Sequence, residues 1–279
     1  MRIPVLTYHS MAVNGNEYHD NDHVALGEDL RILTRLGYRI VSLDEVVTWR
    51  ESPARAPTND RKLVAISFDD GPDFDYHDLP HPTFGMQRSM LNLLHDFRDE
   101  AGTGAQPGLH ATSFVIVSPE ARRILDSTCM VGRDWWRDSW WEPAIRSGLL
   151  GIANHSWDHN HPTLAAPTSG GRGTGTFTTI DHFDAAEDQI ARASRFLHAR
   201  AENPAASLFA YPYGQANDYL IREYLPRHGE RIGIRAAFAC APTPVTEASD
   251  PWNLPRYVNG SDWRSPGDFI TMLRDSSGS

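Results

Sequence analysis

The stretch Leu63-Val-Ala-Ile-Ser-Phe-Asp-Asp-Gly-Pro72 decides the fold class. Its first part, Leu63–Phe68, is apolar apart from one serine. Such a run is typical of a strand that is buried on both faces of a parallel sheet. Gly71 and Pro72 then indicate a turn. A strand of this kind needs helices over the sheet, so the stretch predicts an α/β architecture.

The rest of the chain alternates in the same way between short apolar runs and amphipathic stretches, as βα units require. We expect a helix to open at Ser118-Pro119-Glu120, where the proline suits a first helical position, and a helix capped by Asp44 to run through Trp49. The other predicted strands cover residues 3–8, 39–43, 111–117, 149–153, 208–210, 232–240 and 254–258. The other predicted helices cover residues 24–36, 86–100, 135–146, 181–200 and 217–224.

Composition limits the classes of function. The chain has 279 residues, 40% of them apolar and 22% charged, and a net charge of −10. We expect one catalytic domain over residues 1–279, and no nucleic-acid partner, because this charge repels phosphate backbones. No signal-peptide core and no run of about 20 apolar residues is present, so a cytoplasmic protein without a membrane span is expected, or a secreted one if a leader was removed. The two cysteines are expected to be small buried hydrophobes.

Three predicted strands end in residues that can carry out chemistry. Asp69-Asp70 follows the strand 63–68, His155 follows the strand 149–153, and Tyr211–Gly214 follows the strand 208–210. In barrels and open α/β sheets, ligands bind where the strands end. The coincidence predicts a single site.

The residue types at these ends suit a metal. Asp69 and Asp70 repel each other unless a cation or a proton intervenes, although an isolated pair is more often a turn. His155 and His159 stand four residues apart, and on one helical turn they would face the same ion. Each signal is weak alone, since 13 histidines are present and His161 is also close. Together they supply two imidazoles, one carboxylate ligand and a second carboxylate that can take a proton from water.

Three motifs carry a resemblance to a known family. Ser67-Phe-Asp-Asp-Gly71, Asn154-His-Ser-Trp-Asp-His159 and Phe209-Ala-Tyr-Pro-Tyr-Gly214 resemble, in order and spacing, the motifs of the polysaccharide deacetylases (NodB homology, carbohydrate esterase family 4). The resemblance spans roughly residues 3–258. It implies a distorted (β/α) barrel of seven strands. It also implies that Asp69 is the general base, that the backbone N–H of Tyr213 helps to stabilise the oxyanion, and that the metal ligands are Asp70, His155 and His159.

The chain departs from the family pattern at two places. Ala210 stands where the third motif usually carries an arginine that orients the base, and the C-terminal Leu-x-His that supplies the general acid is missing. The branch that deacetylates poly-β-1,6-N-acetylglucosamine looks circularly permuted, with its acid histidine near the N-terminus. By that resemblance His9 is the expected acid, and Arg256 is a candidate for the lost arginine. The alternatives are a histidine packed by the strand and an ordinary ion pair.

Aromatic residues surround the second motif. Trp157 lies within it and is expected to wall the pocket. A tryptophan cluster comes shortly before it and either stacks on sugars or packs into the core. The members of this cluster are Trp135, Trp136, Trp140 and Trp141.

These features predict a metal-dependent hydrolase that removes an N-acetyl or other N-acyl group from a sugar. The resemblance implies one divalent ion, with Zn²⁺ expected and Co²⁺, Ni²⁺ or Fe²⁺ also suited to the ligands. Two alternatives remain: a hydrolase of a formamide or cyclic ureide, and a catalytically silent carbohydrate-binding domain. The intact Asp69, Asp70, His155 and His159 argue against the second. The substrate, the native metal and the oligomeric state stay open.

Overall fold

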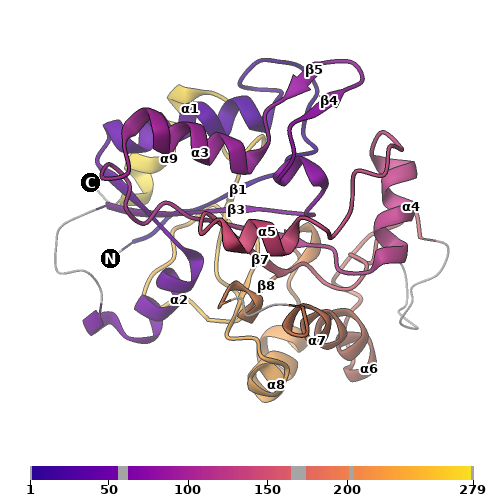
Figure 1. Cartoon of the computed structure of the whole chain (residues 1–279). Coiled ribbons are helices and arrows are strands. Elements are labelled where there is room, and N and C mark those ends of the chain that lie inside the picture. The colour runs from indigo at the N-terminus through magenta and orange to yellow at the C-terminus, as the bar shows by residue number, and fades with distance from the viewer. Residues whose placement is uncertain (1, 56–61, 165–173, 201–203, 278–279) are drawn as a thin grey trace.

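The structure is a computed structural model that describes residues 2–55, 62–164, 174–200 and 204–277. Within these residues, eight strands pair in parallel in one sheet (Figure 1). The path through the sheet is β10-β1-β3-β6-β7-β8-β9, and β2 pairs with the first half of β3. The strands are β1 (Val5–Tyr8), β2 (Tyr38–Val41), β3 (Lys62–Phe68), β6 (Ala111–Val115), β7 (Leu150–Asn154), β8 (Leu208–Ala210), β9 (Ala236–Phe238) and β10 (Tyr257–Val258).

The segment that leads into β10 closes this sheet into a ring. The Leu254 N–H donates to the Ala237 carbonyl at 2.8 Å, and the Ala239 N–H donates to the Leu254 carbonyl at 2.8 Å, so the segment lies against β9. It continues as β10, which pairs with β1. The seven strands of the path therefore form a distorted (β/α) barrel, and the fold class predicted from the sequence is confirmed.

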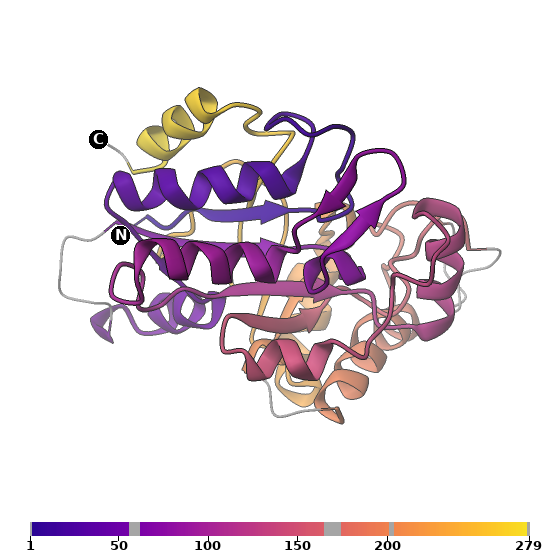
Figure 2. The ribbon, with the colours of Figure 1, turned by 45° about the horizontal axis from the view of Figure 1, so that its top comes forward.

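Helices cover the outside of the ring. Figures 1 and 2 show α9, α1 and α3 stacked over one side of the sheet, with α2, α7 and α8 on the opposite side. Among the described residues, no helix is both long and apolar enough to span a membrane. The α-helices are α1 (Asp22–Arg35), α2 (Leu43–Glu51), α3 (Met90–Ala101), α4 (Pro119–Cys129), α5 (Trp141–Arg146), α6 (Phe183–Ala186), α7 (Arg192–His198), α8 (Leu225–Ile232) and α9 (Pro266–Ser277).

Shorter elements complete the fold. The π-helical turn η3 (Glu187–Ala191) joins α6 to α7, and η6 (Leu220–Tyr224) leads into α8, so both helices are longer than their α-helical parts. An antiparallel hairpin of β4 (Leu79–His81) and β5 (Gly85–Gln87) projects between β3 and α3 (Figure 2). The 3₁₀ turns are η1 (Pro53–Arg55), η2 (Asp73–Asp75), η4 (Pro204–Ser207) and η5 (Pro212–Gly214).

The interior of the ring is filled by alternate residues of the strands. One buried cluster draws a side chain from each of six strands around the ring, which follows from the two-residue period of a strand. Leu63, Ala65 and Ser67 share the inner face of β3, and Asp69 continues this row beyond the strand. The inner cluster includes Val5, Ala65, Phe114, Ala153, Ala210 and Phe238.

Two predicted helices begin later than expected. The helix predicted over 86–100 begins at Met90 with Ser89 as its N-cap, because residues 85–87 pair with β4 as a strand. Of residues 135–146, only 141–146 are helical. The Asp126 carboxylate accepts hydrogen bonds from the N–H groups of Asp134 and Trp135, both at 2.9 Å, and these bonds favour a turn over a helix.

The N-cap of α2 also differs from the prediction. Ser42, and not Asp44, caps this helix. Ser42 Oγ accepts from the Glu45 N–H at 3.1 Å, and the Glu45 carboxylate accepts from the Ser42 N–H at 3.0 Å. This reciprocal pair is a capping box, which satisfies two backbone donors at once.

Candidate metal and catalytic site

Asp69 and Asp70 directly follow β3, and their side chains point in different directions. Asp70 has a left-handed φ of 76°, which aspartate adopts more readily than most residues. Gly71 follows at a φ of 70°, and a Cβ added there would lie 2.4 Å from Val115 Cγ1. The turn therefore requires glycine. It leaves Asp69 beside Arg256 inside the ring and turns Asp70 towards the histidines.

His155 and His159 come from a tight turn after β7, and not from the helical turn predicted from their spacing. Ser156 and His159 have φ values of 70° and 64°, which no right-handed helix allows. Asn154 Oδ1 accepts from the Ser156 N–H at 2.7 Å, and Ser156 Oγ accepts from the His159 N–H at 2.9 Å. These local bonds favour the turn, and the two imidazoles converge nevertheless.

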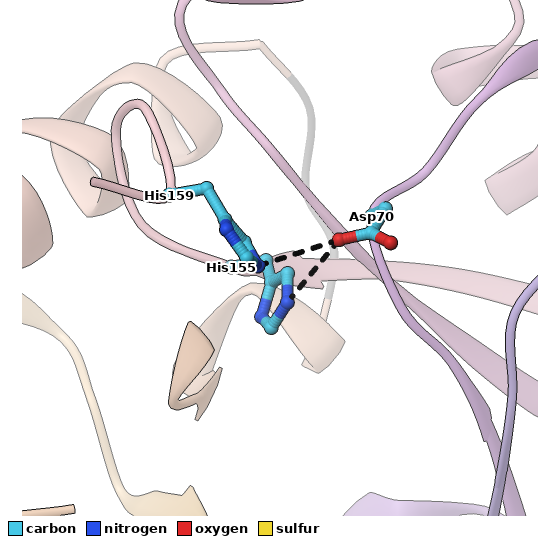
Figure 3. A group of neighbouring side chains, drawn as sticks. All are labelled: Asp70, His155 and His159. Atoms are coloured by element: carbon cyan, nitrogen blue, oxygen red, sulfur yellow. Dashed lines mark ion pairs between the residues drawn. The ribbon is translucent and has the colours of Figure 1, made fainter. Parts of the chain in front are cut away.

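Figure 3 shows the two imidazoles and Asp70 facing one another. Asp70 Oδ1 lies 3.6 Å from His155 Nε2 and 3.5 Å from His159 Nε2. Two atoms that bind one ion at about 2.1 Å with a tetrahedral angle are about 3.4 Å apart. The spacing of these three side chains therefore fits a single divalent ion, and three protein ligands leave one tetrahedral position for water or substrate.

The environment of the imidazoles favours their metal-binding form. His155 Nδ1 lies 2.9 Å from the Ala210 carbonyl, which only accepts, so Nδ1 carries the proton and Nε2 keeps its lone pair. Burial lowers the pKa of both His155 and His159, and this favours neutral rings. His159 Nδ1 is buried without a partner among the described residues. Two nitrogens and one oxygen suit zinc, and also cobalt, nickel or iron.

Arg256 and Asp69 form an ion pair inside the ring. Arg256 Nη1 donates to Asp69 Oδ1 at 2.6 Å, and Nη2 donates to Oδ2 at 2.8 Å. The arginine is fully buried, and Asp69 is 4% exposed. Burial alone raises the pKa of Asp69, but the charge and hydrogen bonds of Arg256 outweigh it and hold this pKa well below its ordinary value. The carboxylate therefore stays ionised and in one orientation.

A pocket of about 390 Å³ opens over these side chains. His9 follows the end of β1 and lies on the wall of the pocket, and its backbone N–H donates to Asp22 Oδ2 at 2.7 Å. The Tyr213 ring packs against the His159 ring with centroids 4.4 Å apart, and Tyr213 has a φ of 60°. The Tyr213 N–H makes no hydrogen bond within the described part of the chain, so it can donate to a bound molecule.

Trp157 lies outside the lining of this pocket. Its ring packs edge-on against Phe196, and the Arg192 guanidinium lies 3.7 Å from the ring centroid. The backbone of Trp157 is held on the same side, because its N–H donates to the Gln189 carbonyl at 2.8 Å. The turn at Ser156 therefore directs this tryptophan into the core.

The tryptophan cluster before the histidine motif is buried as well. Trp135, Trp136, Trp140 and Trp141 are all at most 9% exposed, as the core alternative predicted. Trp136 alone among them also lines the pocket, and its Nε1–H donates to the Asp70 carbonyl at 3.1 Å. It supports the turn that carries Asp70.

Sequence reasoning missed both cysteines as pocket residues. Cys129 and Cys240 are free, exposed and part of the pocket lining, so the expectation that they are buried hydrophobes is wrong. Cys129 Sγ lies 3.8 Å from Nε2 of His161, and His161 is not one of the three side chains that could hold a metal. The one signal for Cys240 was its position at the end of a predicted strand, on the edge where the other site residues gather.

Residues 104–231 match the family model described as polysaccharide deacetylase. This range contains the second and third motifs, while the first motif precedes it. No match was found among curated proteins. The match agrees with the resemblance to polysaccharide deacetylases that the motifs carry.

Solved structures of deacetylases share the fold. Streptococcus pyogenes deacetylase PplD in complex with acetate is 16% identical over 98% of both chains, with a TM-score of 0.63. A de-N-acetylase from Aggregatibacter actinomycetemcomitans is 17% identical, over 98% of this chain and 100% of that chain, with a TM-score of 0.62. The BpsB deacetylase domain from Bordetella bronchiseptica is 15% identical, over 92% of this chain and 95% of that chain, with a TM-score of 0.58. Identities this low establish a common fold and nothing about substrate.

Proposed function

We propose that the protein is a metal-dependent hydrolase that removes an N-acetyl or other N-acyl group from a carbohydrate. One observation carries the proposal: the triad Asp70, His155 and His159 lies in the same pocket as Asp69, whose carboxylate is held by Arg256. A set of metal ligands beside a separate ionised carboxylate is what hydrolysis by an activated water requires. The match to the polysaccharide deacetylase model supports the bond between an acyl group and a sugar nitrogen as the one that is hydrolysed.

Asp70, His155 and His159 would hold the ion. A divalent metal at that place supplies Lewis acidity, which polarises a carbonyl oxygen and lowers the pKa of water. His155 is oriented for this task by the Ala210 carbonyl. Zinc suits the ligands, and cobalt, nickel or iron would also fit.

Asp69 is the proposed general base. Each carboxylate oxygen has two lone pairs, and Arg256 uses one on each oxygen, so Asp69 can still accept a proton from the attacking water. The His155 Nε2 lies 4.0 Å from Asp69 Oδ2, which places the base directly beside the proposed ligands. Fixing both oxygens holds the base in one geometry and lowers the entropic cost of the reaction.

The pocket also offers a donor for the oxyanion and a donor for the leaving group. The Tyr213 N–H is free to stabilise negative charge on the carbonyl oxygen of the substrate. His9 is the proposed general acid, because an amine leaves only after it has been protonated and imidazole exchanges protons near neutral pH. The backbone N–H of His9 donates to Asp22 Oδ2, which holds this end of β1 at the pocket wall.

The test is release of acetate from N-acetylglucosamine oligomers by the purified protein, with and without a chelator. Formamides and cyclic ureides are assayed in parallel, since they are the substrates of the alternative hydrolase. Asp69→Asn is the matched variant, because it keeps the shape of the side chain and removes the basicity. It should lower turnover by about 10² to 10⁴ while the metal content stays unchanged. Sugar binding without turnover on any substrate, with or without metal, would contradict the proposal and indicate a silent binding domain.

A further inference from the structure

His23, in the first turn of α1, has both ring nitrogens against backbone carbonyls. Nε2 lies 2.8 Å from the Ser10 carbonyl, and Nδ1 lies 2.7 Å from the Arg88 carbonyl. The residue is 3% exposed. Carbonyl oxygens only accept hydrogen bonds, so both contacts are satisfied only when both ring nitrogens carry protons. A neutral ring satisfies one of them.

The contact with Ser10 matters because Ser10 directly follows His9. Three side chains hold the end of β1: Asp22 binds the backbone N–H of His9, Asp75 binds the Ser10 hydroxyl, and His23 binds the Ser10 carbonyl. Asp22 and His23 are adjacent on α1, so one helical turn fixes the backbone on both sides of the His9 side chain. The Arg88 contact ties the same turn to the residue after β5, at the base of the hairpin.

We propose that His23 is a positioning residue for His9, which acts by donating its Nε2–H to the Ser10 carbonyl and so fixes the strand end that presents the His9 imidazole to the pocket. The inference rests on the proposed function, in which His9 protonates the leaving amine. Displacement of a catalytic group by about 1 Å can slow a reaction by about 10²-fold. Loss of the Ser10 contact should therefore slow the hydrolysis of amides, and spare activated esters, whose leaving groups need no proton.

The proton state of His23 is set by opposing effects. Burial lowers its pKa, while the Ser10 and Arg88 carbonyls and the Asp78 carboxylate raise it, and His81 lowers it further. The net direction is downward. A ring that has lost one proton keeps the bond to Ser10 in its Nε2–H tautomer and the bond to Arg88 in its Nδ1–H tautomer, so the proposal requires the Nε2–H tautomer or the doubly protonated ring.

Two variants separate the two contacts. In His23→Gln the side-chain amide nitrogen takes the place of Nε2 and can still reach Ser10, whereas in His23→Asn it takes the place of Nδ1 and can reach only Arg88. The measurement is the ratio of kcat for an N-acetylated sugar to kcat for an activated acetate ester. We expect this ratio to fall by about 10-fold or more in His23→Asn and to stay near the native value in His23→Gln. His110→Asn, at a histidine before β6 and so at the opposite end of the strands, is the matched control.

Equal loss of amide and ester hydrolysis in His23→Asn would indicate a structural role alone and overturn the proposal. If that variant does not fold, nitrogen NMR of the native protein decides: a proton on His23 Nε2 supports the proposal, and a lone pair there overturns it. His9→Ala separates this inference from the proposed function. A native amide-to-ester ratio in His9→Ala would refute the role of His9 itself. A lowered ratio in His9→Ala with a native ratio in His23→Asn would refute the role of His23 alone.

Discussion

Replacement of Arg256 by methionine should destabilise the protein far more than the loss of an exposed ion pair of the same geometry. Arg256→Met keeps an unbranched apolar side chain but leaves the buried Asp69 carboxylate without its partner. An uncompensated charge of this kind costs about 3–5 kcal/mol. With a urea slope of about 2 kcal/mol per M, the unfolding midpoint should fall by about 1.5–2.5 M.

Arg31 offers the matched control. It forms a similar forked pair with Glu100, with N–O distances of 2.6 to 3.1 Å, but the two side chains are 51% and 54% exposed. Because water screens this pair, Arg31→Met should cost about 0–1 kcal/mol. The assay is urea unfolding followed by circular dichroism, with a chelator present so that bound metal does not add to the stability of the folded state.

A second substitution tests the cause of the loss. Adding Asp69→Asn to Arg256→Met removes the stranded charge, so the double variant should recover part of the lost stability, and the coupling between the two sites follows from the double-mutant cycle. The reasoning is refuted if Arg256→Met lowers the midpoint no more than Arg31→Met does. It is also refuted if Asp69→Asn destabilises the Arg256→Met protein further, because the buried charge would then not be the source of the loss.

Three further outcomes are expected. Elemental analysis should find about one divalent ion per chain, and His155→Ala should lose most of it; an unchanged metal content would remove His155 from the ligand set. His9→Ala should slow amide hydrolysis by about 10² or more and affect an activated ester much less, so parallel loss of both rates would contradict its role as the acid. Burial raises the pKa of Asp29 to about 7, so the folded state holds a proton that the unfolded chain has released between about pH 4 and pH 7. The contribution of this protonated carboxyl to stability is complete below about pH 4 and is lost as the pH rises to 7. Asp29→Asn should therefore flatten that part of a plot of unfolding free energy against pH. An unchanged slope would contradict a buried, protonated Asp29.

The strands were predictable because their signal is local. The buried run before Asp69 and the alternation of short apolar runs with amphipathic stretches are properties of neighbouring residues, and they suffice to indicate a parallel α/β fold. The β4–β5 hairpin before α3 was not predicted, because a residue far away in the sequence stabilises it. Gln87 accepts a hydrogen bond from Asn21 at 2.8 Å, and no local pattern in residues 79–87 reveals a partner that far along the chain.

The site was predictable in its residues more than in its geometry. The four-residue spacing of His155 and His159 correctly brought the two imidazoles together, although the turn around Ser156 does so without a helix. The roles of His9 and Arg256 came from a resemblance, because nothing in their immediate sequence marks them as neighbours of Asp69. Trp157 shows the limit of that reasoning, because its proximity in sequence to His155 and His159 did not place its ring in the pocket.

A closed ring explains how the site can be assembled from an unusual order of residues. In a barrel, the distance between two strand ends depends on their positions around the ring, and the order in which the chain visits them has no effect. β1, which carries His9, lies between β10 and β3, and Arg256 directly precedes β10. The Arg256 guanidinium therefore comes from the β10 side of β1, while Asp69 and Asp70 come from the β3 side. Ala210 can then lack a charged side chain, because its backbone carbonyl still orients His155 while the partner of Asp69 arrives from the far end of the sequence.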